Sequence, residues 1–323
     1  MKRFDICGMG EFLIDFTSSP ADENGKPRYA ANPGGAHPNV LAAAARMGRP
    51  TAMLSRVGSD SLGQFLVDTL NEVGVNTDGV VRDTTCNTTL AFVHNAADGD
   101  RSFSFYWRNS ANTRFAPEDL RADILQNSRI LQLGSLLMST PLGRETTMRA
   151  LELAKEAGLT VSFDPNVRPA MWEDLSEMVP CIRRVLPYAH ILKVSEEEAE
   201  LLTGSADPAE ASRMLMEEFA NLEVVFVTLG AEGCFYRSRR YSGSCASVKV
   251  EAVDTTGCGD SFTGGALCTW LDFGCPLQEL TEAQLKAMVT HGCRIGAYVA
   301  TKYGGVLSMP TPAQLEAFLA AQK

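Results

Sequence analysis

The chain has 323 residues, of which 45% are hydrophobic, and a formal net charge of −10. This length predicts one large domain with an appendage, and the acidic balance argues against a nucleic-acid or anionic-membrane surface. We expect no signal peptide, because residues 1–5 carry charges and lead into no apolar h-region, and no membrane span, because no stretch approaches 18 uninterrupted apolar residues. The nine cysteines are odd in number and lack a CxxC pair, which predicts a reduced, cytoplasmic protein and not a disulfide scaffold or zinc site.

The first quarter of the chain predicts a strand, a hairpin and then alternating helix and strand. The apolar run from Phe4 to Gly10 ends in glycine and predicts a core strand. A turn-rich segment between two short apolar runs, 12–16 and 27–31, predicts a hairpin. The segments that follow are predicted as helix 37–48, strand 51–57 and helix 61–73.

The pattern changes between residues 80 and 108. Short β-branched or aromatic runs follow one another without a helix, at 80–82, 88–94 and 101–107. Strands connected in this way are expected to be antiparallel and to form a small sheet of their own. With the hairpin, they predict a β lid built from segments 12–31 and 80–108.

From residue 130 onward, strands and helices alternate, which predicts a mostly parallel sheet covered on both faces. The expected strands are 130–133, 160–163, 189–193, 224–229, 233–236 and 247–253. The expected helices are 142–157, 173–187, 196–203, 208–220, 261–273, 282–302 and 312–321. The predicted fold is therefore an α/β sandwich of three layers, with residues 1–323 as one domain carrying the small lid.

The segment from Asp254 to Gly265 follows a predicted strand and opens a predicted helix. The backbone N–H groups of Gly257, Cys258 and Gly259 would point at one spot at a helix N-terminus and favour an anion there. Asp260 would lie in the first turn, where a carboxylate can act as the base that activates a hydroxyl toward phosphate. A capped helix after a tight turn explains each residue singly, but it needs no acid at Asp260, so the segment as a whole indicates function.

Further polar residues lie at the first helix and in the first hairpin. Gly34 and Gly35 allow a ligand close to the backbone, and Asn39 would project beside it from the first helical turn. A glycine turn before a Pro-containing helix is the alternative. Asp15 is a lone acid in an apolar run and is either an exposed strand residue or a ligand contact.

Three more segments begin where predicted core strands end, at the sheet edge where open parallel sheets bind ligands. Asn166 is a loop former or a substrate contact, and Arg168 is a surface charge or a contact suited to a transferring phosphate. Ser195 and Glu198 match a capping box, although the acid could also hold a magnesium-bound water. The predicted nucleotide contacts are Lys193, Thr228, Gly230, Gly233, Gly257 and Gly259. Together these residues indicate phosphoryl transfer.

Over nearly the whole chain, these motifs resemble the ribokinase-like carbohydrate kinases, also called the PfkB-type family. Asp254 to Asp260 is similar to the family's DTxGAGD signature with Cys258 in place of alanine, and Gly34 to Asn39 is similar to its sugar-binding signature. The resemblance implies that Asp15, Gly35 and Asn39 hold sugar hydroxyls and that Asp260 is the base. It implies Mg²⁺ with ATP, through Glu198, and a monovalent cation such as K⁺ at Asp254, Thr256, Gly304 and Ser308.

Within the family, the chain most resembles bacterial fructokinases. Segments 101–106, 163–168, 193–198 and 308–311 are similar to that subgroup, whereas Trp107 and residues 109–112 depart from it. The resemblance implies phosphorylation of D-fructose to fructose 6-phosphate, with Phe103 and Arg108 of the lid near the sugar. The alternatives are a 2-keto-3-deoxygluconate kinase, a nucleoside or ribose kinase, and a catalytically silent sugar-binding regulator. We also expect a homodimer joined through the lid, and no nucleic-acid or membrane partner.

Overall fold

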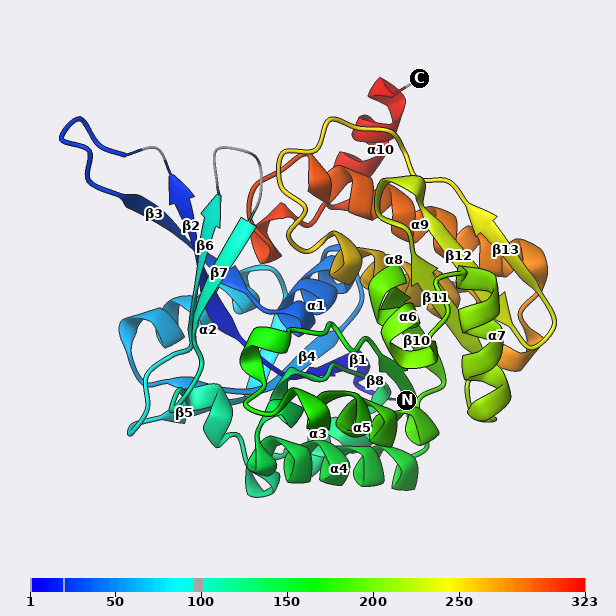
Figure 1. The fold of residues 1–323 in the computed structure, drawn as a ribbon, viewed down its shortest axis with the longest axis horizontal. Helices are drawn as coiled ribbons and strands as arrows, with labels where there is room; N and C mark the ends of the chain where they lie inside the picture. The colour runs from blue at the N-terminus through cyan, green and yellow to red at the C-terminus, as the bar shows by residue number, and fades with distance from the viewer. Residues whose placement is uncertain (1, 20, 96–100, 323) are drawn as a thin grey trace.

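A large, mostly parallel sheet lies between two layers of helices in the computed structural model, which describes residues 2–19, 21–95 and 101–322 (Figure 1). Its strands run in the order β13-β12-β11-β10-β9-β8-β1-β4-β5. Their bounds are β1 Phe4–Met9, β4 Thr51–Gly58, β5 Val75–Asp83, β8 Ser128–Leu133, β9 Thr160–Phe163, β10 Ile191–Ser195, β11 Val224–Thr228, β12 Cys234–Ser238 and β13 Ser242–Cys245. The predicted fold class is confirmed.

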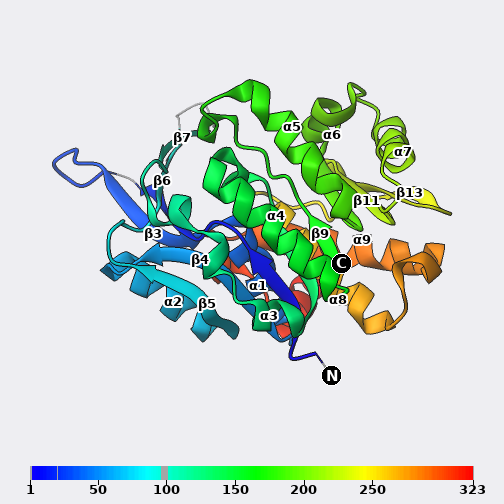
Figure 2. The ribbon, with the colours of Figure 1, turned by 90° about the horizontal axis from the view of Figure 1, so that it is seen from below.

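Helices cover both faces of this sheet (Figure 2). One face packs against α3 Ala122–Gln126, α4 Pro141–Glu156, α5 Leu175–Val185, α6 Glu196–Thr203 and α7 Pro208–Glu218. The other face packs against α1 Ala36–Arg46, α2 Ser61–Glu72, α8 Cys258–Phe273 and α9 Glu282–Ala300, with α10 Pro312–Ala321 beyond them. The central strands are apolar and almost wholly buried because both of their faces are covered.

A four-stranded small sheet stands apart from the main one, at the upper left of Figure 1. Its strands are β2 Leu13–Ser19, β3 Arg28–Gly34, β6 Leu90–Asn95 and β7 Arg101–Tyr106. The predicted hairpin is confirmed as the antiparallel pair of β2 and β3, and β6 pairs antiparallel with β7. The pairing of β2 with β6 is parallel, so this sheet is not wholly antiparallel as predicted.

The prediction that residues 80–82 belong to the lid is wrong. They form the second half of β5, which pairs in parallel with β4 at the edge of the main sheet. Helix α2 is the crossover that returns the chain to this edge, and the strand begins directly after Gly74, whose φ is 91°. The short apolar run at 80–82 was therefore the end of a longer, half-buried strand.

The predicted strand at 247–253 is also absent from the described structure. The ladder between β12 and β13 ends at the pair Cys234 and Cys245, and the chain then leaves the sheet. A Cβ on Gly233 would lie 2.0 Å from the Cys245 carbonyl oxygen, so the two segments meet too closely there for any other residue. The Val253 N–H instead donates to the Ala300 carbonyl at the end of α9.

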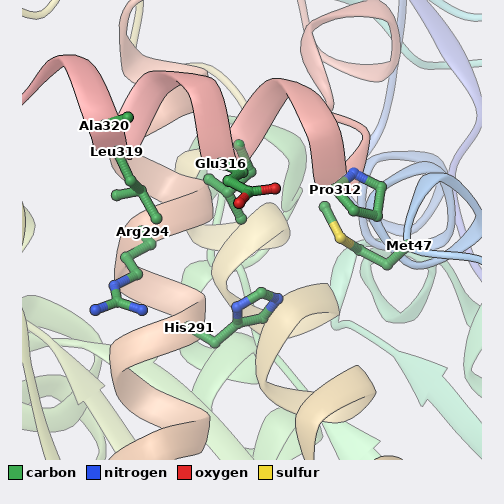
Figure 3. Close-up of a pocket in the computed structure, with 8 residues that line it drawn as sticks. Met47, His291, Arg294, Pro312, Glu316, Leu319 and Ala320 are labelled. Atoms are coloured by element: carbon green, nitrogen blue, oxygen red, sulfur yellow. The ribbon is translucent and has the colours of Figure 1, made fainter.

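The C-terminal helix α10 covers a surface pocket of about 440 Å³ beside α9 (Figure 3). His291 and Arg294 of α9 face it, as does Met47 at the end of α1. None of the residues with a predicted ligand contact lines this pocket. Among the described residues, no helix combines the length and apolar character that crossing a membrane requires.

Candidate active site

A polar pocket of about 320 Å³ lies where the carboxyl ends of β9 and β10 meet the N-termini of α1 and α8. We call it the acidic pocket. Val93 and Phe105 of the small sheet also line it. The predicted residues that it brings together are Asp15, Gly35, Asn39, Asn166, Arg168, Lys193, Thr256, Gly257, Gly259 and Asp260.

Asp260 lies in the first turn of α8, as predicted, because Gly257 has a φ of 79° and ends the preceding loop at the N-cap. The Asn39 side chain donates from Nδ2 to Asp260 Oδ2 at 2.8 Å. Burial and the nearby Asp164 carboxylate raise the pKa of Asp260 to about 6, while Asn39, Lys193 and Arg168 act in the opposite direction. Asp260 is therefore mostly ionised at neutral pH, and its pKa is close enough to that pH for the carboxylate to accept a proton.

Two glycines before α1 leave room for the acids of this pocket. A Cβ on Gly34 would lie 1.9 Å from Asp15 Oδ2, and one on Gly35, whose φ is 109°, would lie 2.5 Å from the Glu11 carbonyl oxygen. Burial raises the pKa of Asp15 to about 7, and the positive charge of Arg168 only partly opposes this. Asp15 can thus serve as acceptor or as donor toward a hydroxyl near neutral pH.

A buried ion pair joins Lys193 and Asp164, with Lys193 Nζ 3.1 Å from Asp164 Oδ2. Burial by itself would lower the pKa of Lys193, but Asp164, Glu198 and Asp260 raise it above its ordinary value. A Cβ on Gly259 would lie 3.1 Å from Lys193 Nζ, so the ammonium lies against the first turn of α8. A positive charge therefore lies beside the helical turn that carries Asp260.

A second pocket, of about 470 Å³, lies on the other side of the α8 N-terminus. We call it the glycine-lined pocket. Thr228, Gly230 and Gly233 line it, as does the segment 247–250, which replaces the predicted strand. Small residues of α9 complete the wall, with Gly292 and Gly296 among them. Thr255 and Gly259 line both pockets, so the turn that carries Asp260 separates them.

Some predicted residues lie elsewhere. Lys193 lines the acidic pocket and not the glycine-lined one. Arg108 lines a third pocket, and its Nε lies 3.4 Å from Glu173 Oε1 with the arginine side chain 78% exposed. The neighbouring Trp107 is buried and donates to Ser139. The Phe103 side chain lies outside the described part of the structure.

Sequence reasoning overlooked Glu11 and Leu136, which also line the acidic pocket. Glu11 directly follows the glycine that ends the first predicted strand, and its place at a strand end was the available signal. Leu136 follows β8 in a short helical turn and has no polar feature that could have pointed to it.

The described residues contain no cluster of three or more acids, histidines or cysteines suited to a metal ion. Glu198 forms the predicted capping box, and its two oxygens accept from the Val167 and Ser195 N–H groups at 2.7 and 2.9 Å. Asp254 accepts from the Thr256 and Gly304 N–H groups at 2.9 and 3.3 Å, and Ser308 donates to the Gly305 carbonyl. Asp254 thus draws two of the predicted cation-binding segments together.

Comparison with known proteins places this geometry in a family. Residues 4–312 match the family described as "pfkB family carbohydrate kinase". The chain is 36% identical over 316 residues to "Probable fructokinase-4" of Arabidopsis thaliana, covering 97% of this chain and 96% of that protein.

Solved structures agree over the full length. The crystal structure of fructokinase with bound ATP from Xylella fastidiosa has a TM-score of 0.88 and 29% identity, covering 100% of this chain and 99% of that one. The fructokinase from Vibrio cholerae O395, in its fructose, ADP and calcium ion bound form, has a TM-score of 0.87 and 29% identity, covering 98% of this chain and 99% of that one. The chain therefore belongs to the pfkB family of carbohydrate kinases.

Proposed function

We propose that this protein transfers the γ-phosphoryl group of ATP to a sugar hydroxyl, with D-fructose as its preferred substrate and fructose 6-phosphate as the product. The observation that carries the proposal is the placement of Asp260 on the turn shared by the two pockets. The acidic pocket offers side chains that pair with hydroxyls, and the glycine-lined pocket offers close backbone contact to a nucleotide. The similarity to proteins named fructokinase supports the choice of sugar.

The reaction needs one proton transfer and one displacement. Asp260 accepts the hydroxyl proton while the sugar oxygen attacks the γ-phosphorus, and the bond to the oxygen bridging the β- and γ-phosphates breaks to release ADP. The N–H groups of residues 257–260 point to the charge that develops on the transferred group, and Lys193 and Arg168 add positive charge nearby. Asp15 and Asn39, which line the same pocket, orient the sugar. Positioning and electrostatics supply most of the catalysis in such transfers.

The proposed reaction uses one divalent and one monovalent cation. A divalent cation entering with ATP would neutralise phosphate charge, and we propose Mg²⁺, since this ion is usually held by substrate phosphates and few protein groups. Glu198 keeps lone pairs for a metal-bound water beside the two N–H groups that it accepts. We propose a monovalent cation, K⁺, at the backbone oxygens of the segments that Asp254 joins.

We expect kcat/KM for fructose to exceed that for ribose by at least tenfold. A site built around particular hydroxyls discriminates against a sugar that leaves one of its buried polar groups unpaired. Release of ADP should be measured with fructose, ribose, 2-keto-3-deoxygluconate and nucleosides. A preference for one of the other substrates would replace fructose and leave the kinase reaction standing. No sugar-dependent ADP release from any of them would favour a silent sugar-binding regulator.

The small sheet supports two further proposals, a lid over the sugar and a dimer. Val93 and Phe105 face the acidic pocket, whereas residues of alternate position stack on the other face. The rings of Phe16 and Phe92 stack with their centroids 4.9 Å apart. The Tyr106 ring meets Phe92 edge-on with the centroids 5.5 Å apart, and Tyr106 is 63% exposed. Because an exposed aromatic face of this kind suits a partner surface, a second copy is expected to cover it.

We expect sedimentation at micromolar concentration to show a dimer, and Tyr106→Glu to convert it to a monomer with the fold retained. The exposed Tyr303→Glu is the matched control, because Tyr303 lies outside the small sheet and is 72% exposed. A wild-type monomer, or a Tyr106→Glu dimer, would contradict the proposed interface.

A further inference from the structure

A histidine lies buried at the centre of the sheet edge that carries the acidic pocket. His37, in the first turn of α1, is 2% exposed. A Cβ on Gly10 would lie 1.8 Å from His37 Cδ2, and one on Gly134 would lie 3.2 Å from Cε1. These glycines follow the neighbouring strands β1 and β8, so the chain keeps both strand ends free of side chains where the imidazole lies.

Glu11 holds this imidazole. His37 Nε2 lies 3.5 Å from Glu11 Oε2, and the other carboxylate oxygen, Oε1, accepts from the Ala36 N–H at 2.8 Å. In the described part of the chain, His37 Nδ1 has no hydrogen-bond partner, so Glu11 fixes the orientation of the ring. Glu11 is therefore attached both to the ring and to the first N–H of α1.

The electrostatics favour the ionised form of both partners. Burial by itself would raise the pKa of Glu11, but the charge and hydrogen bond of His37, with the Ala36 N–H, hold it below its usual range. Burial would likewise lower the pKa of His37, but Glu11 raises it above its ordinary value, assisted by Asp260 and Asp164. The interaction between the two groups therefore favours the charged form of each.

This pair adjoins the groups proposed to bind sugar and accept its proton. Glu11 lines the acidic pocket, and Asn39, two residues after His37, donates to Asp260. The negative charge of Glu11 acts to raise the pKa of Asp15. The charged groups that face His37, Asp15 and Asp260 from the surrounding elements are Glu11, Asp164, Arg168, Lys193 and Asp254.

We propose that Glu11 and His37 are positioning residues of the phosphoryl transfer: the imidazolium neutralises Glu11 at the pocket wall and fixes the α1 N-terminus, so that Asp15 and Asp260 can ionise in the working pH range. The kinetic consequences of this proposal rest on the proposed kinase reaction. The assignment of a positive charge to His37 and a negative charge to Glu11 rests only on the contact between these two side chains.

The kinetic test compares pH profiles of kcat/KM for whichever sugar the wild-type protein phosphorylates. His37→Gln removes a positive charge that acts on Asp260, so the acid limb should move to higher pH by about one unit, the size expected when a neighbouring opposite charge is lost. Glu11→Gln removes the carboxylate that acts to raise the pKa of Asp15. The acid limb of this variant should therefore not move to higher pH.

The double variant decides between charge and packing. With both charges gone, the acid limb of Glu11→Gln/His37→Gln should return toward that of the wild type, although more of the pair has been removed. Damage to packing alone would instead leave the double variant displaced at least as far as His37→Gln. His190→Gln is the matched control, since His190 accepts from the Val161 N–H at the far end of β9 and should leave the limb unchanged.

A second measurement is independent of turnover and of the folding of any variant. In NMR titration of the wild-type protein, the His37 ring should remain protonated to a pH above the ordinary histidine value of about 6.5, whereas burial lowers the pKa of His190 and His291. A His37 ring that loses its proton with those two would overturn the proposal. A protein that phosphorylates no sugar but retains a protonated His37 would overturn the proposed function and leave the ion pair standing.

Discussion

Replacing Asp260 with asparagine should lower kcat by about 10²–10⁴-fold, the usual contribution of a general base. The amide keeps the size of the side chain and its place beside Asn39, but it cannot accept the hydroxyl proton. Sugar and ATP affinities should therefore stay within about tenfold of the wild type, because the contacts of both pockets remain. Steady-state ADP release and equilibrium binding of each substrate measure the two effects separately.

The same variant should be more stable than the wild type at alkaline pH. The pKa of Asp260 is raised from 3.8 to about 6 in the folded protein. The free energy of unfolding of the wild type therefore falls as pH rises from about 4 to about 6, and the loss stays constant at higher pH. Asparagine avoids this cost, and we expect a gain of roughly 1–3 kcal/mol at pH 8 that is absent at pH 3. Urea unfolding at both values measures it.

Two outcomes would contradict this assignment. A variant that retains more than half of the wild-type kcat would exclude Asp260 as the base. Equal free energies of unfolding for the two proteins at pH 8 would show that burial does not raise the pKa of the Asp260 carboxyl group. Asp68→Asn is the matched control, because Asp68 is an exposed acid on α2 and should change neither quantity.

Replacing Lys193 with methionine should destabilise the protein by about 3–5 kcal/mol, the usual result of removing one partner of a buried ion pair. Asp164 would remain buried without its cation, 2% exposed, in the same cluster as Asp260. Lys193 also acts to lower the pKa of Asp260. Its loss should therefore move the acid limb of kcat to higher pH as well as weaken the fold.

Denaturant unfolding at pH 7.5 measures the loss, with Lys286→Met as the control. Lys286 is an exposed residue of α9, and its replacement should stay within about 0.5 kcal/mol of the wild type. A Lys193→Met protein as stable as that control would mean that Asp164 is neutral or finds another partner. Lys193→Arg, which keeps the charge, should recover part of the stability.

The elements that the sequence predicted well are those with a long, periodic apolar pattern. Helix α8 follows directly from the glycine turn at Gly257, and the alternation after residue 130 leaves little choice but a parallel sheet. The half-buried strand β5 was misplaced because only 80–82 carried a clear apolar signal. The segment 247–253 is apolar for another reason, since part of it lines the glycine-lined pocket and does not pair in the sheet.

The site shows the same limit. Residues at strand ends could be assembled in advance because parallel strands bring their carboxyl ends to one edge. Asn166 and Arg168, which follow β9, do line one pocket with Lys193 of β10. Arg108 could not be placed, because its direction depends on how β7 rejoins the main body. The pairing of Glu11 with His37 was missed because it depends on burial and on the distance between two side chains, which no local sequence pattern records, although the place of Glu11 at a strand end was a signal for the pocket.

The turn that contains Thr255 and Gly259 belongs to the walls of both pockets. A ligand that contacts this turn in one pocket therefore changes the affinity of the other pocket for its own ligand. The resulting coupling free energy must be identical in both directions, because binding equilibria form a closed cycle. If bound nucleotide changes the affinity for sugar by some factor, bound sugar changes the affinity for nucleotide by the same factor, whichever ligand binds first.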